Sequence, residues 1–314
     1  MAQAPDKHVV IACPHGFCAG VVRAIASAKK ALAIYKRPIY CLNEIVHNER
    51  VVSELNAEGM IFVKDIAKVP PGAMVLFSAH GIPPGVRRTA EKAGLRVIDA
   101  TCPFVEKIHQ EVRYYAAKEY TVFVIGHSGH EEIIGIAGEA PGNVKVLSTP
   151  DEAERIEPIW DNGKTAVVTQ TTFSISATQK IINTLKRRFP RLETQKHKDI
   201  CYATENRQKA TAELCKRVDL VLVLGSKNSS NTRRLFEIAA QYHPDSSYMV
   251  SNLGDMKSVG LERHSAIGIT AGASTPESFM EQVLGQLKSA GFERTDVLKV
   301  AMENVNLLLP AAIR

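Results

Sequence analysis

The sequence lacks any long apolar run, and no stretch approaches the ~20 consecutive apolar residues that a membrane-spanning helix needs. Its first residues, Met1 to Lys7, do not contain the apolar core of a secretory signal peptide. From these two absences we expect a cytoplasmic protein with no membrane partner. With 314 residues, the chain is long enough for two or three compact lobes.

The sequence also lacks the usual motifs for nucleotides and nucleic acids. Neither G-x-x-x-x-G-K-[ST] nor G-x-G-x-x-G occurs, so a nucleotide is not indicated. The formal net charge is only +6, and no stripe of basic residues alternates with aromatic ones. We therefore expect no nucleic-acid partner. The modest positive charge suits an anionic small substrate.

Six cysteines are present, but none forms a C-x-x-C pair. This excludes the usual spacing of zinc ribbons and of thioredoxin-type redox sites. In a reducing compartment the cysteines are expected to remain free thiols rather than disulfides. Cys41 and Cys215 lie within apolar patterns and are predicted to be core residues. Cys13 stands five positions before Cys18, a spacing that is specific to no known kind of site.

Short apolar runs alternate with helical patterns along nearly the whole chain, which predicts an α/β fold with mainly parallel sheets. Beyond the apolar run at residues 8–12, we expect strands at residues 39–42, 73–78, 96–98, 122–125, 145–147, 166–169, 220–224, 248–250 and 266–270. Helices are expected at residues 19–35, 103–118, 174–188, 205–217, 231–241 and 276–290.

The same arrangement occurs three times: a cysteine precedes a helix, and a strand with a polar loop follows. Gly126 ends a strand 24 residues after Cys102, and Gly225 ends one 24 residues after Cys201. The following loops hold His130 and Ser229, each 28 residues after its cysteine. After Cys18, the corresponding loop contains His47 at 29 residues. A further polar turn follows in each segment, at residues 78–81, 169–172 and 270–275.

This internal repeat predicts three pseudo-equivalent α/β lobes in a trefoil-like arrangement around a central cavity. We assign residues 1–99 to the first lobe, 100–198 to the second and 199–293 to the third. The tail, residues 294–314, is expected to dock on the body of the protein. Because functional loops collect at the carboxyl ends of parallel strands, the three cysteines and their polar loops are expected to converge on the cavity.

Three converging thiolates suit an iron–sulfur cluster better than structural zinc, which takes four protein ligands. One iron of a four-iron cluster would then lack a protein ligand and could act on a substrate oxygen as a Lewis acid. A catalytic zinc site and three unrelated structural cysteines remain alternatives at this point.

The polar loops offer mainly neutral hydrogen-bond donors, which suit a phosphate or diphosphate held at helix N-termini. These residues are His47, His80, His130, Ser229, Ser230, Asn231 and Ser274. Serine and asparagine also cap helices without any ligand, so each residue alone has a structural explanation. Glu131 and Glu132 follow His130 and suit the first turn of a helix. A carboxyl group here, hydrogen-bonded through Thr171 or His130, could also supply a proton.

Taken together, these motifs resemble the LytB/IspH family, the 4-hydroxy-3-methylbut-2-enyl diphosphate reductases. The resemblance runs from about residue 10 to residue 276 and rests on the segments Gly16-Phe-Cys-Ala-Gly20, Ile45-Val-His-Asn48, Phe77-Ser-Ala-His-Gly81, Asp99-Ala-Thr-Cys-Pro103, Thr169-Gln-Thr-Thr172, Asp199-Ile-Cys-Tyr-Ala-Thr204, Gly225-Ser-Lys-Asn-Ser-Ser-Asn231 and Thr270-Ala-Gly-Ala-Ser274.

The resemblance implies an oxidoreductase that catalyses the last step of the methylerythritol phosphate route to isoprenoids. Such an enzyme removes the allylic hydroxyl of its diphosphate substrate with two electrons and two protons, and a ferredoxin or flavodoxin supplies the electrons. The resemblance also implies that Cys18, Cys102 and Cys201 hold one [4Fe–4S] cluster per chain. Glu132 would donate the proton through Thr171, with His130 close by. The implied substrate-binding residues are His47, His80, His130, Thr171, Ser229, Ser230, Asn231 and Ser274.

One position departs from the family pattern, because His130-Glu131-Glu132 stands where relatives read His-Pro-Glu. We expect Glu131 to face solvent. Two other functions stay open: a redox-neutral iron–sulfur dehydratase, and an iron–sulfur sensor or binding protein without turnover.

Overall fold

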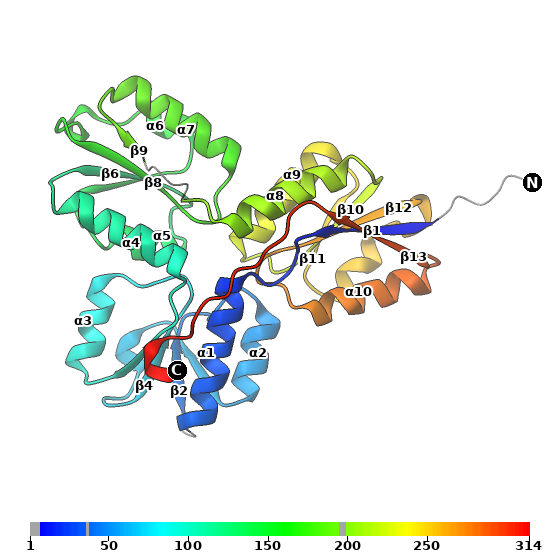
Figure 1. The fold of residues 1–314 in the computed structure, drawn as a ribbon, viewed down its shortest axis with the longest axis horizontal. Helices are drawn as coiled ribbons and strands as arrows, with labels where there is room; N and C mark the ends of the chain where they lie inside the picture. The colour runs from blue at the N-terminus through cyan, green and yellow to red at the C-terminus, as the bar shows by residue number, and fades with distance from the viewer. Residues whose placement is uncertain (1–6, 36–37, 195–198) are drawn as a thin grey trace, which may run out of the picture. The chain divides into compact units, whose positions relative to one another are not determined.

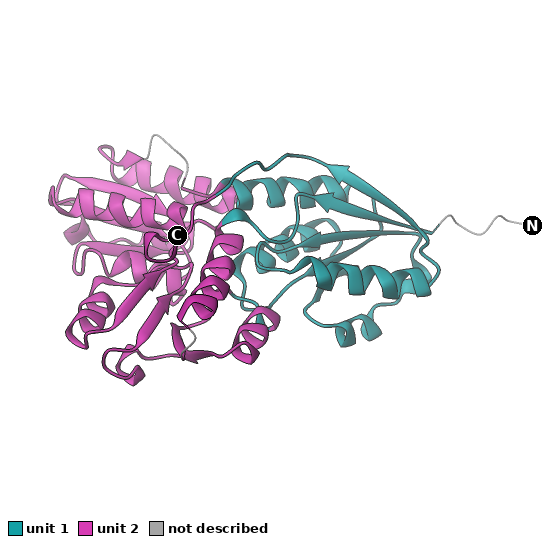
Figure 2. Ribbon diagram, turned by 60° about the horizontal axis from the view of Figure 1, so that its bottom comes forward, with its two compact units in different colours: residues 1–19, 47–49, 202–306 teal, residues 20–46, 50–201, 307–314 magenta. Residues whose placement is uncertain are grey.

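The computed structural model describes residues 7–35, 38–194 and 199–314, and these divide into two compact units (Figure 2). Unit 1 comprises residues 1–19, 47–49 and 202–306, and unit 2 comprises residues 20–46, 50–201 and 307–314. Within the described residues, no helix combines the length and the apolar character needed to cross a membrane.

Strands and helices alternate along the chain, and every strand pairing among the described residues is parallel (Figure 1). The predicted α/β class is therefore confirmed. Three parallel sheets are present, which we call sheets A, B and C. The placement of the three lobes around a common cavity stays a prediction.

Unit 1 contains sheet A, with the strand order β11-β10-β12-β1-β13. Its strands are β1 (His8–Cys13), β10 (Leu220–Leu224), β11 (Ser247–Val250), β12 (Ala266–Ala271) and β13 (Arg294–Lys299). Its helices are α8 (Tyr202–Cys215), α9 (Ser230–Tyr242) and α10 (Glu277–Ser289), with short 3₁₀ helices at Leu253–Ser258 and Leu261–Arg263.

Sheet A is buried on both faces. Alternate residues of β1 and β10 point to opposite sides, as the two-residue period of a strand requires. Val10, Val221 and Val223 pack with α8 and α9, whereas Val9, Leu220 and Leu222 pack with α10. Figure 1 shows α8 and α9 on one side of this sheet and α10 on the other. This two-sided burial explains the continuous apolar sequence Leu220-Val-Leu-Val-Leu224.

Unit 2 contains sheet B, with the order β3-β2-β4-β5, and sheet C, with the order β7-β6-β8-β9. The strands are β2 (Ile39–Leu42), β3 (Met60–Val63), β4 (Met74–Phe77), β5 (Arg96–Asp99), β6 (Thr121–Ile125), β7 (Val144–Leu147), β8 (Thr165–Thr169) and β9 (Glu193–Thr194). The helices are α1 (Ala19–Tyr35, of which Ala19 belongs to unit 1), α2 (Glu49–Ala57, of which Glu49 belongs to unit 1), α3 (Pro84–Lys92), α4 (Pro103–Ala116), α5 (Glu131–Ala137), α6 (Pro150–Glu154) and α7 (Ile175–Arg188), with 3₁₀ helices at Ile66–Lys68, Pro158–Trp160 and Ala311–Ile313.

Four strands have the same order in all three sheets: the second strand lies at the edge, followed by the first, the third and a closing strand, and sheet A adds β13 beyond its closing strand. The closing strands are β5, β9 and β1, and a cysteine follows each of them before the next helix. The strand-like run at residues 8–12 was predicted to belong to the first lobe, residues 1–99. This assignment is wrong, because β1 pairs with β12 and β13 and so completes sheet A.

The C-terminal tail, predicted as residues 294–314, contacts the rest of the protein near its beginning and near its end. Its first residues form β13, which pairs with β1, and the Val300 amide donates to the Cys13 carbonyl at 2.9 Å. In unit 2, Arg23 Nε of α1 donates to the Leu308 carbonyl at 2.7 Å. β13 was not predicted as a strand because its sequence, Arg294-Thr-Asp-Val-Leu-Lys299, alternates weakly and is largely exposed.

In unit 2, a glycine allows the lobe of sheet C to approach the lobe of sheet B. Gly138 ends helix α5, and a Cβ atom at this position would lie 2.4 Å from the Cβ of Pro83, the residue before α3. Such a distance is far inside van der Waals contact, so any side chain here would push the two elements apart.

We predict that Gly138→Ala lowers the free energy of unfolding by about 1–3 kcal/mol, because the methyl group overpacks this contact. Urea denaturation followed by circular dichroism would measure the effect. Gly285→Ala is the matched control: Gly285 lies within α10, and a Cβ atom there would meet no described heavy atom within 4 Å beyond the backbone of its own helix and its chain neighbours. There we expect no loss or a gain of about 0.5–1 kcal/mol from helix propensity. Equal effects of the two substitutions would contradict the prediction.

Candidate active site

The three repeated cysteines each lie between the end of a strand and the start of a helix. Cys102 is the N-cap residue of α4, while Cys18 and Cys201 directly precede α1 and α8. None of the three forms a disulfide within the described chain, and all three are half-buried. Each therefore stands at a helix N-terminus, where the helix dipole favours a thiolate. As predicted, Cys41 and Cys215 are buried, and burial raises the pKa of Cys215 to about 11.

The backbone amide of each cysteine donates a hydrogen bond to a polar turn. This turn follows the third strand of the sheet whose closing strand precedes the cysteine. The amide of Cys18 donates to the Ala273 carbonyl at 3.1 Å, that of Cys102 to Ala79 at 3.0 Å, and that of Cys201 to Thr171 at 3.1 Å. Each bond lies within one unit. The repeat seen in the sequence is thus also a repeat of hydrogen bonding, and it links each cysteine to the turn of the preceding lobe.

In unit 2, a buried carboxyl group is fixed next to one of these turns. The Thr171 amide donates to Glu132 Oε1 at 2.6 Å, and the Thr171 hydroxyl donates to Glu132 Oε2 at 3.0 Å. Only 2% of Glu132 is exposed. The N-cap residue of α5 is His130, whose Nδ1 accepts from the Glu132 amide at 3.1 Å. The residues predicted to work with Glu132, namely Thr171 and His130, are therefore both its hydrogen-bond partners.

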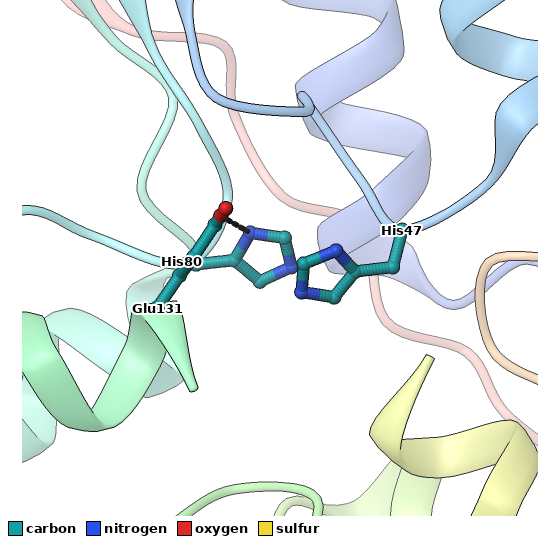
Figure 3. Close-up of side chains that lie close together, drawn as sticks. All are labelled: His47, His80 and Glu131. Atoms are coloured by element: carbon teal, nitrogen blue, oxygen red, sulfur yellow. Dashed lines mark ion pairs between the residues drawn. The ribbon is translucent and has the colours of Figure 1, made fainter. Parts of the chain in front are cut away.

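Glu131 does not face solvent, so the expectation from the sequence was wrong. Its side chain is 22% exposed, and Oε2 lies 3.2 Å from His80 Nδ1 (Figure 3). The rings of His80 and His130 also meet edge to face, with centroids 5.8 Å apart. Glu131 is the first residue of α5, and the packing of that helix sets the direction of the Glu131 side chain. The carboxylate therefore points toward the turn after β4, where His80 lies. Its position next to Glu132 in the sequence does not bring it to the Thr171 hydroxyl.

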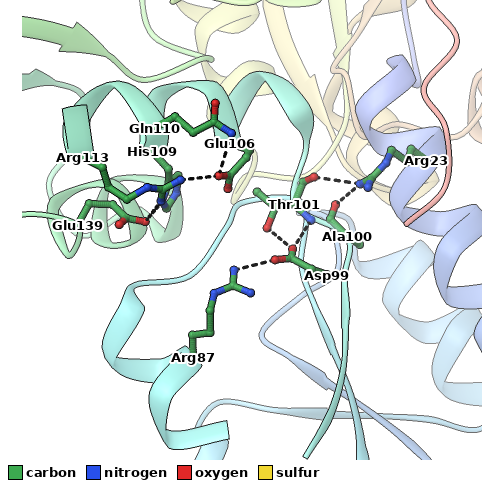
Figure 4. A network of polar contacts seen from close by, with 10 residues as sticks. All are labelled: Arg23, Arg87, Asp99, Ala100, Thr101, Glu106, His109, Gln110, Arg113 and Glu139. Carbon is green, nitrogen blue, oxygen red and sulfur yellow. Dashed lines mark hydrogen bonds and ion pairs between the residues drawn. The ribbon is translucent and has the colours of Figure 1, made fainter. Parts of the chain in front are cut away.

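A polar network holds the turn before Cys102 (Figure 4). The Asp99 carboxylate accepts from the Thr101 amide at 2.9 Å, from the Thr101 hydroxyl at 2.5 Å and from Arg87 at 2.7 Å. Arg23 donates to the carbonyls of Ala100 and Thr101, each at 3.0 Å. Burial alone would raise the pKa of Asp99, but the hydrogen bonds from Thr101 and Arg87 outweigh it and lower the pKa.

A buried histidine packs between the two lobes of unit 2. Nδ1 of His109 lies 2.6 Å from Glu139, which also accepts from Arg113 at 2.8 Å (Figure 4). The opposite edge of the ring, at Nε2 and Cε1, lies against Gly81, where a Cβ would be 2.7 Å from Nε2, and against Gly135 of α5. Gly81 has φ +79°, so both its conformation and its close contact require glycine. His109 thus supports the turn of His80 and the helix of Glu132 together.

The turn before Cys201 is held by a second aspartate. Asp199 accepts from the Thr169 amide at 2.8 Å, and Lys107 Nζ lies 3.4 Å from its other oxygen. Burial, together with the nearby charge of Glu111, raises the pKa of Asp199 to about 7. Asp99 and Asp199 begin the segments Asp99-Ala-Thr-Cys-Pro103 and Asp199-Ile-Cys-Tyr-Ala-Thr204, and each accepts a backbone hydrogen bond near a cysteine. Their electrostatic surroundings nevertheless differ.

In unit 1, the predicted diphosphate-binding residues form a buried polar set at the carboxyl edge of sheet A. Ser229 caps α9 by accepting from the Thr232 amide at 3.3 Å. Asn231 accepts from the Ala273 amide at 3.2 Å, and the Ser274 hydroxyl donates to the His47 carbonyl at 3.0 Å. The Ser230 hydroxyl is different: it is buried and has no hydrogen-bond partner among the described residues.

The structure therefore groups the predicted residues into two sets. Unit 1 holds Cys18, His47, Ser229, Ser230, Asn231 and Ser274, and unit 2 holds Cys102, His80, His130, Glu132, Thr171 and Cys201. The convergence of the two sets on one cavity stays a prediction. His109 was missed by the sequence analysis, because a histidine within an amphipathic helix gives no signal of its distant partners. Arg207, which donates to the loop before Cys18, was missed for the same reason.

Comparison with known proteins adds an independent result. A family model described as LytB protein matches residues 9–288. The chain is 43% identical over 309 residues to the 4-hydroxy-3-methylbut-2-enyl diphosphate reductase of Leifsonia xyli subsp. xyli, covering 98% of this chain and 91% of that protein. It is 45% identical over 273 residues to the protein of the same name from Neisseria meningitidis serogroup C, covering 87% and 84%.

Two solved structures are also similar. The E-1-hydroxy-2-methyl-but-2-enyl-4-diphosphate reductase from Plasmodium falciparum has a TM-score of 0.93 and 36% identity, with 98% of this chain and 97% of that chain covered. A second structure, of (E)-4-hydroxy-3-methyl-but-2-enyl diphosphate reductase, the terminal enzyme of the non-mevalonate pathway, has a TM-score of 0.64 and 30% identity, with 90% and 99% covered.

We predict that Asp99→Asn lowers the free energy of unfolding by about 1–2 kcal/mol at neutral pH, because the amide cannot replace all three hydrogen bonds. Since the pKa of Asp99 is lowered from 3.8 on folding, its contribution exists above that value and is lost as the pH falls through the folded pKa. The gap between variant and wild type should thus narrow below pH 3.8. Urea denaturation at several pH values tests this. Asp65→Asn, at an exposed cap where asparagine serves equally well, is the control.

Proposed function

The chain belongs to the LytB family, and we propose that it is an iron–sulfur reductase acting on (E)-4-hydroxy-3-methylbut-2-enyl diphosphate. The reaction breaks the allylic C–O bond, consumes two electrons and two protons, and gives water with isopentenyl or dimethylallyl diphosphate. It is the last step of the methylerythritol phosphate route. The observation that supports this most directly is the threefold arrangement of a half-buried cysteine whose amide donates to a polar turn, in a chain so similar to proteins of this name.

The cysteines fit an iron–sulfur cluster by their chemistry. Three cysteines of the described chain recur in the repeat, each outside any disulfide there, half-buried and placed at a helix N-terminus. In this proposal Cys18, Cys102 and Cys201 hold one [4Fe–4S] cluster per chain. When bound, the cluster would pass on the electrons of an external donor and would offer an iron that can act as a Lewis acid. The role of the chain is to hold the three sulfur atoms in place. The hydrogen bonds donated by the three cysteine amides and the Asp99 network support this role.

The diphosphate is proposed to bind at the polar sets of both units. The Ser230 hydroxyl supports this assignment, because a buried hydroxyl without a protein partner is costly unless a ligand satisfies it. It belongs to the first turn of α9, where backbone amides and the helix dipole favour an anion. His47, His80, His130, Thr171, Ser229, Asn231 and Ser274 complete the proposed binding residues. Their side chains offer hydrogen-bond donors to phosphate oxygens.

Glu132 is the proposed proton donor. When its carboxyl group is protonated, Oε2–H can donate to the Thr171 hydroxyl, and that hydroxyl can pass its own proton to the leaving hydroxyl of the substrate. The 3.0 Å distance between Thr171 Oγ1 and Glu132 Oε2 allows this transfer, and the amide of Thr171 holds the other oxygen. His130 positions the carboxyl group through the Glu132 amide.

The partners and the compartment follow from the same chemistry. The reaction needs an external one-electron donor, for which a ferredoxin or a flavodoxin is proposed. Cysteines that form no disulfide within the described chain suit a reducing compartment, and we propose the cytoplasm.

We predict that anaerobically purified protein removes the allylic hydroxyl only when a reductant is supplied. The purified protein is incubated with the hydroxylated diphosphate, with and without dithionite-reduced electron carrier, and the products are identified by mass spectrometry. Water loss or addition without reductant would instead indicate a dehydratase. A change in the electron paramagnetic resonance spectrum without product would indicate a sensor or binding protein. Cys102→Ser is the matched loss-of-cluster control, because a hydroxyl binds iron poorly; full iron content in this variant would contradict the proposed ligands.

We further predict that Glu132→Gln and Glu131→Gln have different effects. Glu132→Gln should keep the iron content and substrate binding but lower kcat by about 10²–10⁴-fold, because the amide cannot donate the proton. Glu131→Gln should change mainly KM and only mildly, because its contact is with His80. Steady-state kinetics under anaerobic conditions test both variants. If kcat falls more in Glu131→Gln, the proton donor must be reassigned.

A further inference from the structure

Arg207 lies in unit 1 on α8, and only 1% of it is exposed, although it carries a permanent charge. Its guanidinium group points at the loop before Cys18. Nε and Nη2 donate to the Gly16 carbonyl at 3.2 and 2.9 Å, and Nη2 also lies 3.5 Å from the carbonyls of His15 and Phe17. Three consecutive peptide groups of the loop thus face one cation.

The charge of Arg207 is neutralised by a residue of the C-terminal tail. Nη1 donates to both carboxylate oxygens of Glu303, at 3.0 and 3.2 Å, and Asn206 donates to the same carboxylate at 3.1 Å. Glu303 lies 96 positions from Arg207 in the sequence, in the extended segment that follows β13. The tail is therefore fixed to the sheet by β13 and to α8 by this ion pair.

The carbonyl of Gly16 depends on Arg207 for its hydrogen bonds. Gly16 has φ +63°, and among the described residues only Arg207 donates to its carbonyl. On its other side the loop is tied to the end of β12, through Gly16 N to the Ala271 carbonyl at 3.2 Å and through Cys18 N to Ala273. On the side of α8, Arg207 binds the carbonyls of the same loop, so the loop is held from two sides.

We infer that Arg207 and Glu303 are positioning residues for Cys18: the tail carboxylate orients the guanidinium group, which in turn holds the carbonyls of the loop and so sets the direction of the Cys18 thiol. The inference deepens the proposed function, since Cys18 is one of its cluster ligands. A lysine would not reproduce these contacts, because its single nitrogen cannot stand at the positions of both Nη1, which binds Glu303, and Nη2, which binds the Gly16 carbonyl.

The test compares the alkylation rates of cysteines within the same full-length chain. The protein is purified anaerobically and treated with iodoacetamide, and mass spectrometry of peptides follows the modification of Cys18 and of Cys102 over time. The rate for Cys102 is the internal reference, because its turn is held by Asp99 in the other unit. The ratio of the two rates reports on the Cys18 loop whether or not iron is bound.

Three variants are compared with the wild type. Glu303→Gln removes the charge of the tail residue while keeping its size. Arg207→Met with Glu303→Leu replaces the buried pair by apolar side chains, which chains often tolerate better than one unpaired buried charge. Asp296→Asn is the matched control: it makes the same acid-to-amide change in the tail, at an exposed pair with Arg294 on β13.

We expect the Cys18-to-Cys102 rate ratio to rise about fivefold or more in the double variant and about twofold or more in Glu303→Gln, with no change in Asp296→Asn. Iron release to a ferrous chelator should accelerate in the same order. An unchanged ratio in both folded variants would overturn the inference, and so would an equal rise in Asp296→Asn. If the double variant does not fold, Glu303→Gln decides the outcome. Absence of iron from every sample, including the wild type, would refute the proposed cluster, while the rate ratio would still decide the role of Arg207.

Discussion

The structure of the candidate site depends on one recurring hydrogen bond, from the amide of a cysteine to the carbonyl of a polar turn. It occurs at 3.0–3.1 Å for Cys18, Cys102 and Cys201. In a parallel sheet every strand ends at the same edge, so the closing strand and the third strand release their chains side by side. The bond uses this proximity to fix the backbone of the thiol. A cysteine on a free loop would lose conformational entropy on binding a ligand, whereas these three are already ordered.

The same hydrogen bond explains why the structural repeat does not coincide with the predicted lobes, residues 1–99, 100–198 and 199–293. Each structural repeat runs from the helix after one cysteine to the next cysteine, so the third repeat ends with β1 at the start of the chain. The sequence spacing identified the cysteines and polar turns because these are local. It could not identify the partner of β1, because pairing between β1 and β12 joins residues about 250 positions apart and leaves no local signal. The short apolar run at residues 8–12 fits any of the three sheets equally well.

Other differences between prediction and structure have similar physical origins. The helices with long apolar stripes were predicted closely, and α1 matches at both ends. The strands β3, β9 and β13 were missed. All three are edge strands: β3 has four residues, β9 has only two, and β13 alternates weakly between polar and apolar residues. The orientation of Glu131 depends on how α5 packs through Gly135 on His109, a contact that no residue pattern within α5 reveals. Long-range ion pairs such as Arg207 with Glu303 are unpredictable for the same reason: neither residue type nor spacing indicates the partner.

The hydrogen bonding of the candidate hydroxyl groups separates residues that stabilise the site from a residue that is available to bind a ligand. The four candidate hydroxyl groups, all within the described chain, are those of Thr171, Ser229, Ser230 and Ser274. Thr171, Ser229 and Ser274 each bind a protein group, so they would remain ordered without substrate. Ser230 alone of the four has a buried hydroxyl without a protein partner. Since such a group costs free energy that a ligand oxygen can recover, Ser230 should be the hydroxyl whose contribution is greatest to binding and smallest to folding.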